Sequence, residues 1–374
     1  MTDKSVVVCF NVLMAAFVFG MVVLLTRLRA RNPVRMYLSS GFAVGLLGCL
    51  SALAAPIELF GKIQLASWVV FLHFPVYLLS GASLLFRRSN TASVFGLVTA
   101  TVIVLIGAYS FLVEPFRLEV TRVTISSIKL ATPVRVAVIA DLQTDNPGAY
   151  EEMAMKMVMD ESPDLILFAG DYLQIAYNRY LEKRRVLNGI LRSAGLSAPL
   201  GIYAVKGNCD WRNEWKGIFR GLPVTFFDVS ETLDLGPLIL TGLTEHDSMK
   251  RGLLIKPQEA LLSKHHIVLG HFPDFSMGSV NANLLIAGHT HGGQFQIPFI
   301  GPILTLSRVP RSWASGVTNV GTDKVLIVSR GIGMERGNAP RMRLFCRPEV
   351  IIVDLAPIKR AGSADPTDFR PTTD

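Results

Sequence analysis

Several residues that can bind a metal ion each follow a short apolar run in the chain. They are Asp141, Asp171, Asn208, His271 and His289, and His291 comes two residues after the last of them. A mixture of carboxylate, amide and imidazole donors suits divalent metals such as Mn, Fe, Zn or Ni. The set lacks the thiolate cage of a structural zinc site. The residue types therefore favour a divalent metal site of another kind.

The apolar runs before these residues are typical of short buried β-strands. The five runs cover residues 134–140, 165–169, 202–205, 267–269 and 284–287. Helical patterns between the first three runs, at 151–159 and 180–194, indicate a layered α/β domain. Binding sites in open α/β sheets assemble at the carboxyl ends of the strands. The five strand ends are therefore expected to meet at one rim.

Four further segments are predicted to be strands. Residues 117–125 alternate polar and apolar side chains, as a half-buried strand does. The other three segments are short and apolar, at 238–240, 325–328 and 350–353. The predicted domain therefore covers residues 116–358. The segment 359–374 is rich in Pro, Asp, Thr and Gly, and it is predicted to be a disordered tail.

Each of the candidate ligands is weak evidence when taken alone. A single Asp after a strand is most often a turn former, and a single buried His is usually only hydrogen-bonded. The ordered set is more specific. Along the chain it runs Asp-x-Gln, Gly-Asp, Gly-Asn, Gly-His and finally Gly-His-Thr-His-Gly-Gly. A motif of five parts, each in the expected strand-end context, predicts one shared site.

This order of motifs resembles the calcineurin-like metallophosphoesterase superfamily over roughly residues 117–355. Residues 288–293 are the most specific part. Residues 329–333 and 343–349 are similar to the end of the membrane-associated bacterial branch, which is YkuE-like and akin to the UDP-2,3-diacylglucosamine hydrolases. The resemblance implies two mixed β-sheets in a sandwich flanked by helices. It also implies an enzyme that hydrolyses phosphate ester or anhydride bonds.

The resemblance further implies two divalent metal ions and assigns their ligands. The ligands of the first metal would be Asp141, Gln143, Asp171 and His291. The ligands of the second metal would be Asp171, which bridges, and Asn208, His271 and His289. A hydroxide that bridges the two metals would attack phosphorus in line with the leaving oxygen.

Two positions depart from the family pattern. Gln143 stands where the first motif normally has a histidine, and its amide oxygen is a weaker donor than imidazole. Cys209 stands where a histidine normally steadies the phosphoryl group or protonates the leaving group, and a cysteine cannot be a cationic donor. Asp210, Lys206 or His246 could substitute for it. The catalytic candidates are therefore Asp171, Asn208, Cys209 and Asp210.

These departures leave two functions open. The first is a phosphoesterase acting beside a membrane, for which a lipid-linked or nucleotide-linked phosphoester is the expected kind of substrate. The second is a metal-binding, catalytically weakened domain that serves as a membrane sensor or scaffold. The retention of the other metal ligands favours the enzyme.

The first 115 residues hold most of the apolar excess of a chain that is 50% hydrophobic. Four apolar stretches there are long enough to cross a bilayer core of about 30 Å. They cover residues 6–25, 37–59, 63–85 and 94–113. A cleaved signal peptide is disfavoured because the first stretch is long and arginines follow it. Residues 1–115 are therefore predicted to be a membrane anchor of about four helices.

The net charge of +8 lies partly in short arginine runs beside these stretches. Arg27, Arg29, Arg31 and Arg35 follow the first stretch, and Arg87 and Arg88 follow the third. This placement favours membrane orientation over nucleic-acid binding. Positive loops face the cytoplasm, so four spans would put the catalytic domain outside it, on a bacterial inner membrane. Four cysteines form no disulfide framework or CxxC pair and give no compartment.

Overall fold

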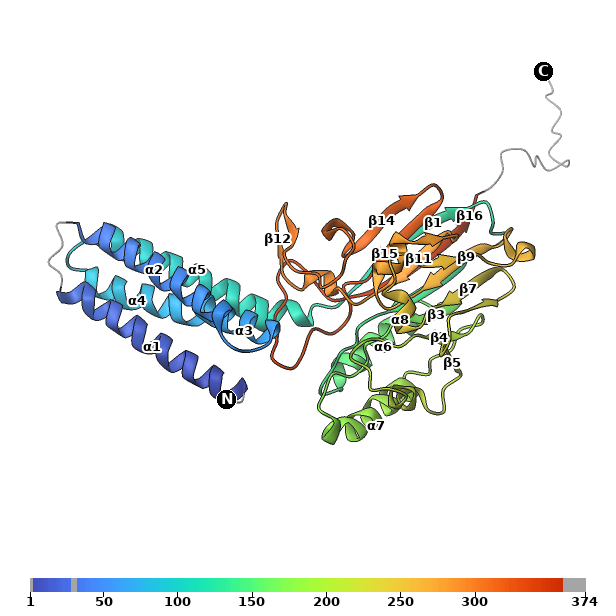
Figure 1. Ribbon diagram of the computed structural model, residues 1–374, viewed down its shortest axis with the longest axis horizontal. Helices are drawn as coiled ribbons and strands as arrows, with labels where there is room; N and C mark the ends of the chain where they lie inside the picture. The colour runs from blue at the N-terminus through green and yellow to red at the C-terminus, as the bar shows by residue number, and fades with distance from the viewer. Residues whose placement is uncertain (1–2, 28–31, 359–374) are drawn as a thin grey trace, which may run out of the picture. The chain divides into compact units, whose positions relative to one another are not determined.

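A computed structural model describes residues 3–27 and 32–358 (Figure 1). The predicted tail at 359–374 lies outside the described residues, as do Arg29 and Arg31. The chain divides into two compact units. One holds the residues up to Arg117 together with Met334–Leu344, and the other holds Leu118–Gly333 and the residues from Phe345 onward.

The first unit contains four helices that are long and apolar enough, by length and composition, to cross a membrane. They are α1 (Asp3–Arg27), α2 (Pro33–Ala54), the run Leu59–Leu85, and the run Asn90–Phe116. The third run joins α3 (Leu59–Trp68), a π-helical turn η1 (Val69–His73) and α4 (Phe74–Leu85). The fourth joins α5 (Asn90–Ala108), η2 (Tyr109–Val113) and η3 (Glu114–Phe116).

The second helix ends earlier than the sequence predicted. It stops at Ala54, whereas the apolar stretch continues to Leu59. Ala55 has ψ of 140° because the ring of Pro56 disfavours helical backbone in the residue before it. The next helix has already begun at Leu59, where the sequence still predicted the end of the second stretch.

Small residues let the helices of this unit approach one another. A Cβ at Gly96 would lie 2.1 Å from the hydroxyl oxygen of Tyr37, so a larger residue could not fit there. The Tyr37 hydroxyl donates to the carbonyl of Leu78 over 2.6 Å. His73 lies 2.8 Å from the side-chain oxygen of Asn11 and is hydrogen-bonded within the helices. Close packing and internal hydrogen bonds are the means by which helices associate in lipid.

The second unit is built on two six-stranded sheets. Sheet one has the order β1 (Glu119–Ser127), β16 (Glu349–Pro357), β2 (Val134–Ile139), β3 (Leu165–Phe168), β4 (Ile202–Ala204) and β5 (Val224–Phe226). Sheet two has the order β14 (Gly316–Gly321), β15 (Lys324–Val328), β11 (Leu284–Ala287), β9 (His265–Leu269), β7 (Leu238–Gly242) and β6 (Glu231–Asp234). Short pairs join β8 (Leu254–Ile255) to β10 (Ser279–Val280) and β12 (Gln296–Ile297) to β13 (Gly301–Pro302).

Both sheets are mixed. Strands β2 to β5 run parallel, and β16 enters antiparallel to β2 and parallel to β1. In sheet two, β7, β9, β11 and β15 run parallel, with antiparallel β6 and β14 at the edges. Side chains such as Val138, Leu167 and Ile286 fill the space between the sheets. The helices α6 (Ala149–Asp160) and α7 (Tyr177–Ser193) cover the other face of sheet one (Figure 1).

The mixed two-sheet fold flanked by helices is confirmed, and every predicted strand is present. Three strands of the two large sheets were not predicted, namely β5, β6 and β14, and neither were the two-residue strands β8, β10, β12 and β13. Strand β14 has the sequence GVTNVG, whose glycines and polar residues give it little intrinsic strand preference. It forms because its backbone pairs with β15.

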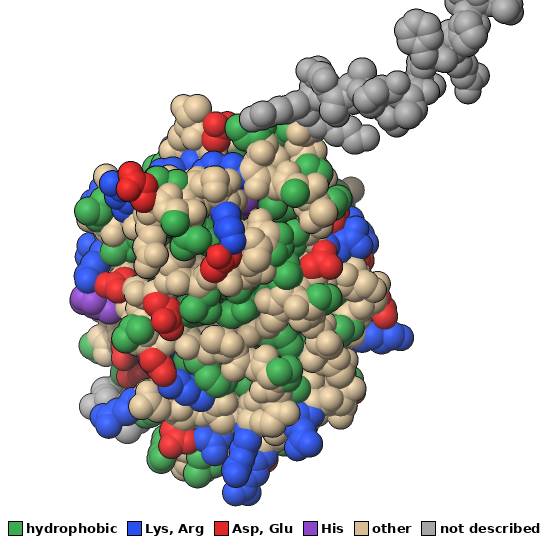
Figure 2. Space-filling view, turned by 90° about the vertical axis from the view of Figure 1, so that its right-hand side faces the viewer, with side chains coloured by type: hydrophobic (Ala, Val, Ile, Leu, Met, Phe, Trp, Pro, Cys, Tyr) green, Lys and Arg blue, Asp and Glu red, His purple; other side chains and the backbone are tan. Residues whose placement is uncertain are grey.

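Acidic and basic side chains are interspersed on the face of the molecule that Figure 2 shows.

Candidate metal centre

Four side chains from the carboxyl ends of β3, β4, β9 and β11 meet at one point. The ligand atoms of Asp171, His271 and His289 all lie within 4.8 Å of one another. The side-chain oxygen of Asn208 is 3.0 Å from Nε2 of His271 and 2.9 Å from Nδ1 of His289. The structure therefore brings together the four residues that the sequence assigned to the second metal.

The hydrogen bonds of the two histidines decide which ring nitrogen faces this point. Nδ1 of His271 lies 2.8 Å from the carbonyl of Ala169, so it carries a hydrogen, and Nε2 presents its lone pair when the ring is neutral. Nε2 of His289 lies 3.3 Å from the carbonyl of Leu306, which leaves the lone pair on Nδ1. Metal-ligating histidines are oriented in this way, by a carbonyl behind the ring.

The donor set fits a cation. In these tautomers Nε2 of His271, Nδ1 of His289, the oxygen of Asn208 and the carboxylate of Asp171 are all acceptors. With neutral rings these converging acceptors repel one another, and in the metal-free protein a proton on His271 relieves part of that repulsion. A divalent metal ion removes that repulsion, and this combination of N and O ligands is one that such ions bind. The residues present therefore fit the metal that the sequence implied.

The remaining three candidates lie beside this cluster. The Gln143 side-chain oxygen is hydrogen-bonded to Nε2 of His291. The carboxylate of Asp141 accepts the backbone N–H of His289 at 3.1 and 3.0 Å. Its Oδ1 is 3.9 Å from the ring of His271. Asp141 and Gln143 are both fully buried. These contacts place the residues assigned to the first metal next to those assigned to the second.

Five of the candidate ligands share an unusual backbone conformation. The φ angles are positive at Asp141 (49°), Gln143 (31°), Asp171 (55°), His289 (69°) and His291 (49°). The left-handed region costs a non-glycine residue about 1–2 kcal/mol. Residues held there cluster at functional sites, because the surrounding fold must impose the conformation. Backbone strain is thus concentrated where the side chains converge.

Two glycines make room for the carboxylates. A Cβ at Gly207 would lie 2.1 Å from Oδ1 of Asp171, which explains why glycine precedes Asn208. A Cβ at Gly331 would lie 2.7 Å from the Cβ of Asp141. Backbone that approaches a buried side chain this closely admits no larger residue.

The carboxylates control the charge of one histidine. Burial lowers the pKa of His271, but the charges of Asp171 and Asp141 outweigh it and raise that pKa to about 9. Burial, together with the charge of His271, lowers the pKa of His289 to about 4. Burial raises the pKa of Asp171, but the interactions with His271 outweigh it and leave that pKa below its usual value. Without metal, His271 thus holds a proton that a bound cation must displace.

Asp210 joins the loops that hold these ligands. Its carboxylate accepts the backbone N–H groups of Asp171 at 3.0 Å, Tyr172 at 2.9 Å and Gly207 at 2.8 Å. Burial and the charge of Asp171 raise the pKa of Asp210 to about 7. Three backbone donors on one carboxylate indicate a residue that fixes loop geometry.

Cys209 lies among the ligands. Its sulfur is 3.3 Å from the amide nitrogen of Gln143, and its backbone N–H donates to Asp171 over 2.7 Å. The other two candidates for the proton donor are Lys206 and His246. Lys206 forms an ion pair with Glu245, and His246 is exposed on α8 (Glu245–Ser248).

Sequence reasoning missed Gln174. The amide nitrogen of Gln143 donates to the side-chain oxygen of Gln174 over 3.0 Å, which turns the oxygen of Gln143 toward His291. Gln174 comes three residues after Asp171, so it is delivered by the same strand end. That adjacency is the signal that could have identified it.

Comparison with known proteins agrees with the arrangement of the motifs. Residues 134–293 match the family model of the calcineurin-like phosphoesterases. The chain is 27% identical to the metallophosphoesterase YkuE of Bacillus subtilis, over 72% of this chain and 97% of that protein. It is 26% identical to the phosphodiesterase YaeI of Escherichia coli, over 66% and 92% of the two chains. It is 25% identical to the metallophosphoesterase Cj0846 of Campylobacter jejuni, over 63% of each chain.

The matched segment contains β2, β3, β4, β9 and β11 with the candidate ligands at their ends. The predicted resemblance is confirmed by the family model and by the relatives, which are named as metallophosphoesterases or a phosphodiesterase. The second unit of this chain therefore carries a calcineurin-like phosphoesterase segment at residues 134–293, and the family and the relatives support a hydrolase of phosphate esters.

Proposed function

We propose that this protein is a membrane-anchored phosphoesterase that uses two divalent metal ions to cleave a phosphodiester or pyrophosphate bond. The observation that supports it best is the convergence of four potential metal ligands, Asp171, Asn208, His271 and His289, at the carboxyl ends of four strands. Mn, Fe, Zn or Ni would suit the nitrogen and oxygen donors. Bound there, the metals would activate a water molecule and neutralise charge on the phosphoryl oxygens.

The protein's own residues would orient this chemistry. Asp171 would be a ligand of both metals through its two carboxylate oxygens. The Cys209 N–H donates to one of these oxygens, and the other lies 3.4 Å from Nε2 of His271. The carbonyls of Ala169 and Leu306 would hold the two imidazoles with their lone pairs inward. Asn208 would complete the set through its amide oxygen.

The leaving group would receive little help from the protein. Position 209 offers a thiol where an imidazolium would donate a proton, and general acid catalysis typically contributes about 10²- to 10⁴-fold. Substrates with leaving groups of low pKa need that help least. A nucleotide-linked pyrophosphate is therefore the proposed substrate class, and the name of the relative YaeI, a phosphodiesterase, adds a phosphodiester as a second candidate.

The four long apolar helices support a membrane anchor. The arginines after the first and third of them would lie on the cytoplasmic side, so the phosphoesterase domain would lie on the opposite face. A lipid-linked substrate would then be within reach of the tethered domain. Fusion of alkaline phosphatase or a fluorescent protein to the C-terminus tests this orientation. Fluorescence without phosphatase activity would reverse it.

The test of the proposed activity uses the full chain in detergent with added Mn and bis-p-nitrophenyl phosphate. Hydrolysis is expected, with two metal ions per chain by elemental analysis, and Asn208→Ala should abolish it. Asn188→Ala, a substitution on α7 away from the cluster, is the matched control. Two bound metals with no turnover on monoesters, diesters or pyrophosphates would instead favour the sensor or scaffold, which the Gln143 and Cys209 replacements motivate.

A further inference from the structure

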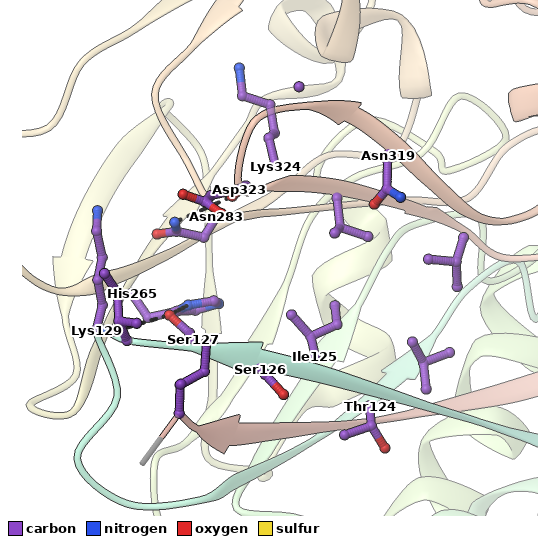
Figure 3. Close-up of a pocket in the computed structure, with 16 residues that line it drawn as sticks. Thr124, Ile125, Ser126, Ser127, Lys129, His265, Asn283, Asn319, Asp323 and Lys324 are labelled. Carbon is purple, nitrogen blue, oxygen red and sulfur yellow. Dashed lines mark hydrogen bonds between the residues drawn. The ribbon is translucent and has the colours of Figure 1, made fainter. Parts of the chain in front are cut away.

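A hollow lies at the opposite end of the phosphoesterase domain from the metal centre. It has a volume of about 690 Å³ and is lined by the end of β1, the starts of β9 and β15, and part of β14 (Figure 3). The register Ile125↔Leu355↔Val134 puts the end of β1 beside the start of β2. The ligands follow the ends of β2 and β9, so strand length separates the two sites by roughly 20 Å.

His265 is the most informative residue of this hollow. Its side chain is fully buried at the start of β9, and its Nδ1 lies 3.0 Å from the hydroxyl of Ser127 (Figure 3). That hydroxyl oxygen already accepts the backbone N–H of Lys129 at 3.2 Å. In the tautomer in which the Ser127 hydroxyl donates to Nδ1, the ring carries its own hydrogen on Nε2. Among the described residues, Nε2 has no hydrogen-bond partner.

The ring is neutral, so its free N–H does not depend on protonation. Burial and the nearby charge of Lys129 lower the pKa of His265 to about 4. A buried donor without a partner costs about 1–3 kcal/mol. Nε2 exposes almost no surface in this structure, so a ligand oxygen that reaches it after the side chains over the ring shift would recover that free energy.

The surrounding charge specifies the kind of acceptor. A neighbouring hollow of about 590 Å³ shares Lys129, Asn283, Asp323 and Lys324 with the first. The two hollows together are lined by three lysines, Lys129, Lys256 and Lys324, against the single carboxylate of Asp323. In the part of the chain that the structure describes, none of these lysines forms an ion pair. The excess of positive charge favours an anion over a neutral ligand.

The walls add an apolar component. Val123 and Ile125 of β1 and Val325 of β15 turn toward the space between the sheets and line the first hollow. Small-molecule sites commonly combine such apolar walls with a few convergent polar groups. We propose that this hollow binds a small organic anion, with its carboxylate or phosphate oxygen accepting from Nε2 of His265 and its apolar body against β1 and β15.

The test uses the full chain in detergent and phenylphosphonate, an organic anion whose carbon–phosphorus bond the proposed hydrolysis does not cleave. Lysine acetylation is followed residue by residue by mass spectrometry. Phenylphosphonate should slow acetylation of Lys129 and Lys324 at least about twofold at a concentration near 1 mM. It should leave Lys156, which is exposed on α6, unchanged. Benzyl alcohol, the neutral probe, should protect none of them.

Variants assign the protection to this hollow. His265→Phe should remove it, and Lys324→Gln should weaken the protection of Lys129 if the first variant does not fold. Asp171→Ala should retain it, because that change affects only the metal centre, and both distal variants should keep phosphoesterase activity. Absence of protection, equal protection of Lys156, or protection that persists in both distal variants would overturn the proposal.

Discussion

Strand β9 starts with one buried histidine and is followed two residues after its end by another. His265 and His271 are equally inaccessible to solvent, yet their pKa values move in opposite directions, to about 4 and about 9. Burial disfavours the charged form of both. The neighbours differ, since two carboxylates face His271 and a lysine lies near His265. The comparison teaches that burial keeps His265 neutral where no carboxylate opposes it, whereas two carboxylates outweigh equal burial at His271.

The largest expected effect comes from removing the carboxylate that distinguishes the two ends. Asp171→Asn should lower kcat/KM for bis-p-nitrophenyl phosphate by about 10³-fold or more, because a shared ligand contributes several kcal/mol of charge stabilisation. Asp160→Asn, on the exposed side of α6, is the matched control and should retain full activity. Undiminished turnover in Asp171→Asn would show that Asp171 is not a required metal ligand.

The second effect is on stability and belongs to His265. In the unfolded chain this histidine takes up a proton near pH 6.5, whereas in the folded chain it does so only near pH 4. The unfolded state therefore binds more protons between these values, and folding stability falls as the pH falls through them. The loss at pH 4 should reach about 3 kcal/mol.

Denaturant unfolding of the metal-free chain, followed by tryptophan fluorescence, measures this loss. Trp215 is buried within the phosphoesterase domain and reports on it. His265→Phe should remove the corresponding part of the pH dependence, and His246→Gln, at an exposed position, should not. The prediction is contradicted if the stability of His265→Phe depends on pH as steeply as that of the parent protein.

A third effect is on metal affinity. Below pH 9 the metal-free protein holds a proton on His271 that the metal must displace. Affinity for Mn should therefore rise about tenfold per pH unit between pH 6.5 and 8.5. Equilibrium dialysis at several pH values measures this slope. His271→Asn should bind more weakly and with a flatter pH dependence, and an affinity independent of pH in the parent would contradict the assignment.

The smallest effect should come from the residue behind Gln143. Gln174→Ala removes the acceptor that orients the Gln143 amide, and loss of such a supporting contact typically lowers metal affinity by about 10-fold. Gln258→Ala, at an exposed position, serves as control. Equal metal affinity in Gln174→Ala and the parent would show that Gln143 needs no such support.

The sequence predicted those features that depend on neighbours along the chain. Each apolar run and the polar residue after it are consecutive, so the strands and the family could be recognised. The positive φ angles of Asp141 and Asp171 could not, because a backbone conformation of that kind is imposed by the surrounding fold. The bonds of Asp210 to loops almost forty residues away, at Asp171 and Tyr172, are equally invisible in the order of residues. The order of residues likewise gives no sign that Met334–Leu344 belongs to the same compact unit as the N-terminal helices.

The position of β16 has a consequence for biosynthesis. Strand β1 pairs with β16 alone among the described strands, and Glu119 lies opposite Glu349. A ribosome adds about 5–20 residues per second, so β1 emerges roughly 10 s or more before its partner exists. During that interval β1 is an unpaired strand beside a long apolar segment, and it is a natural client for a chaperone. A chain cut before β16 would leave β1 without its partner and β2 on an open edge.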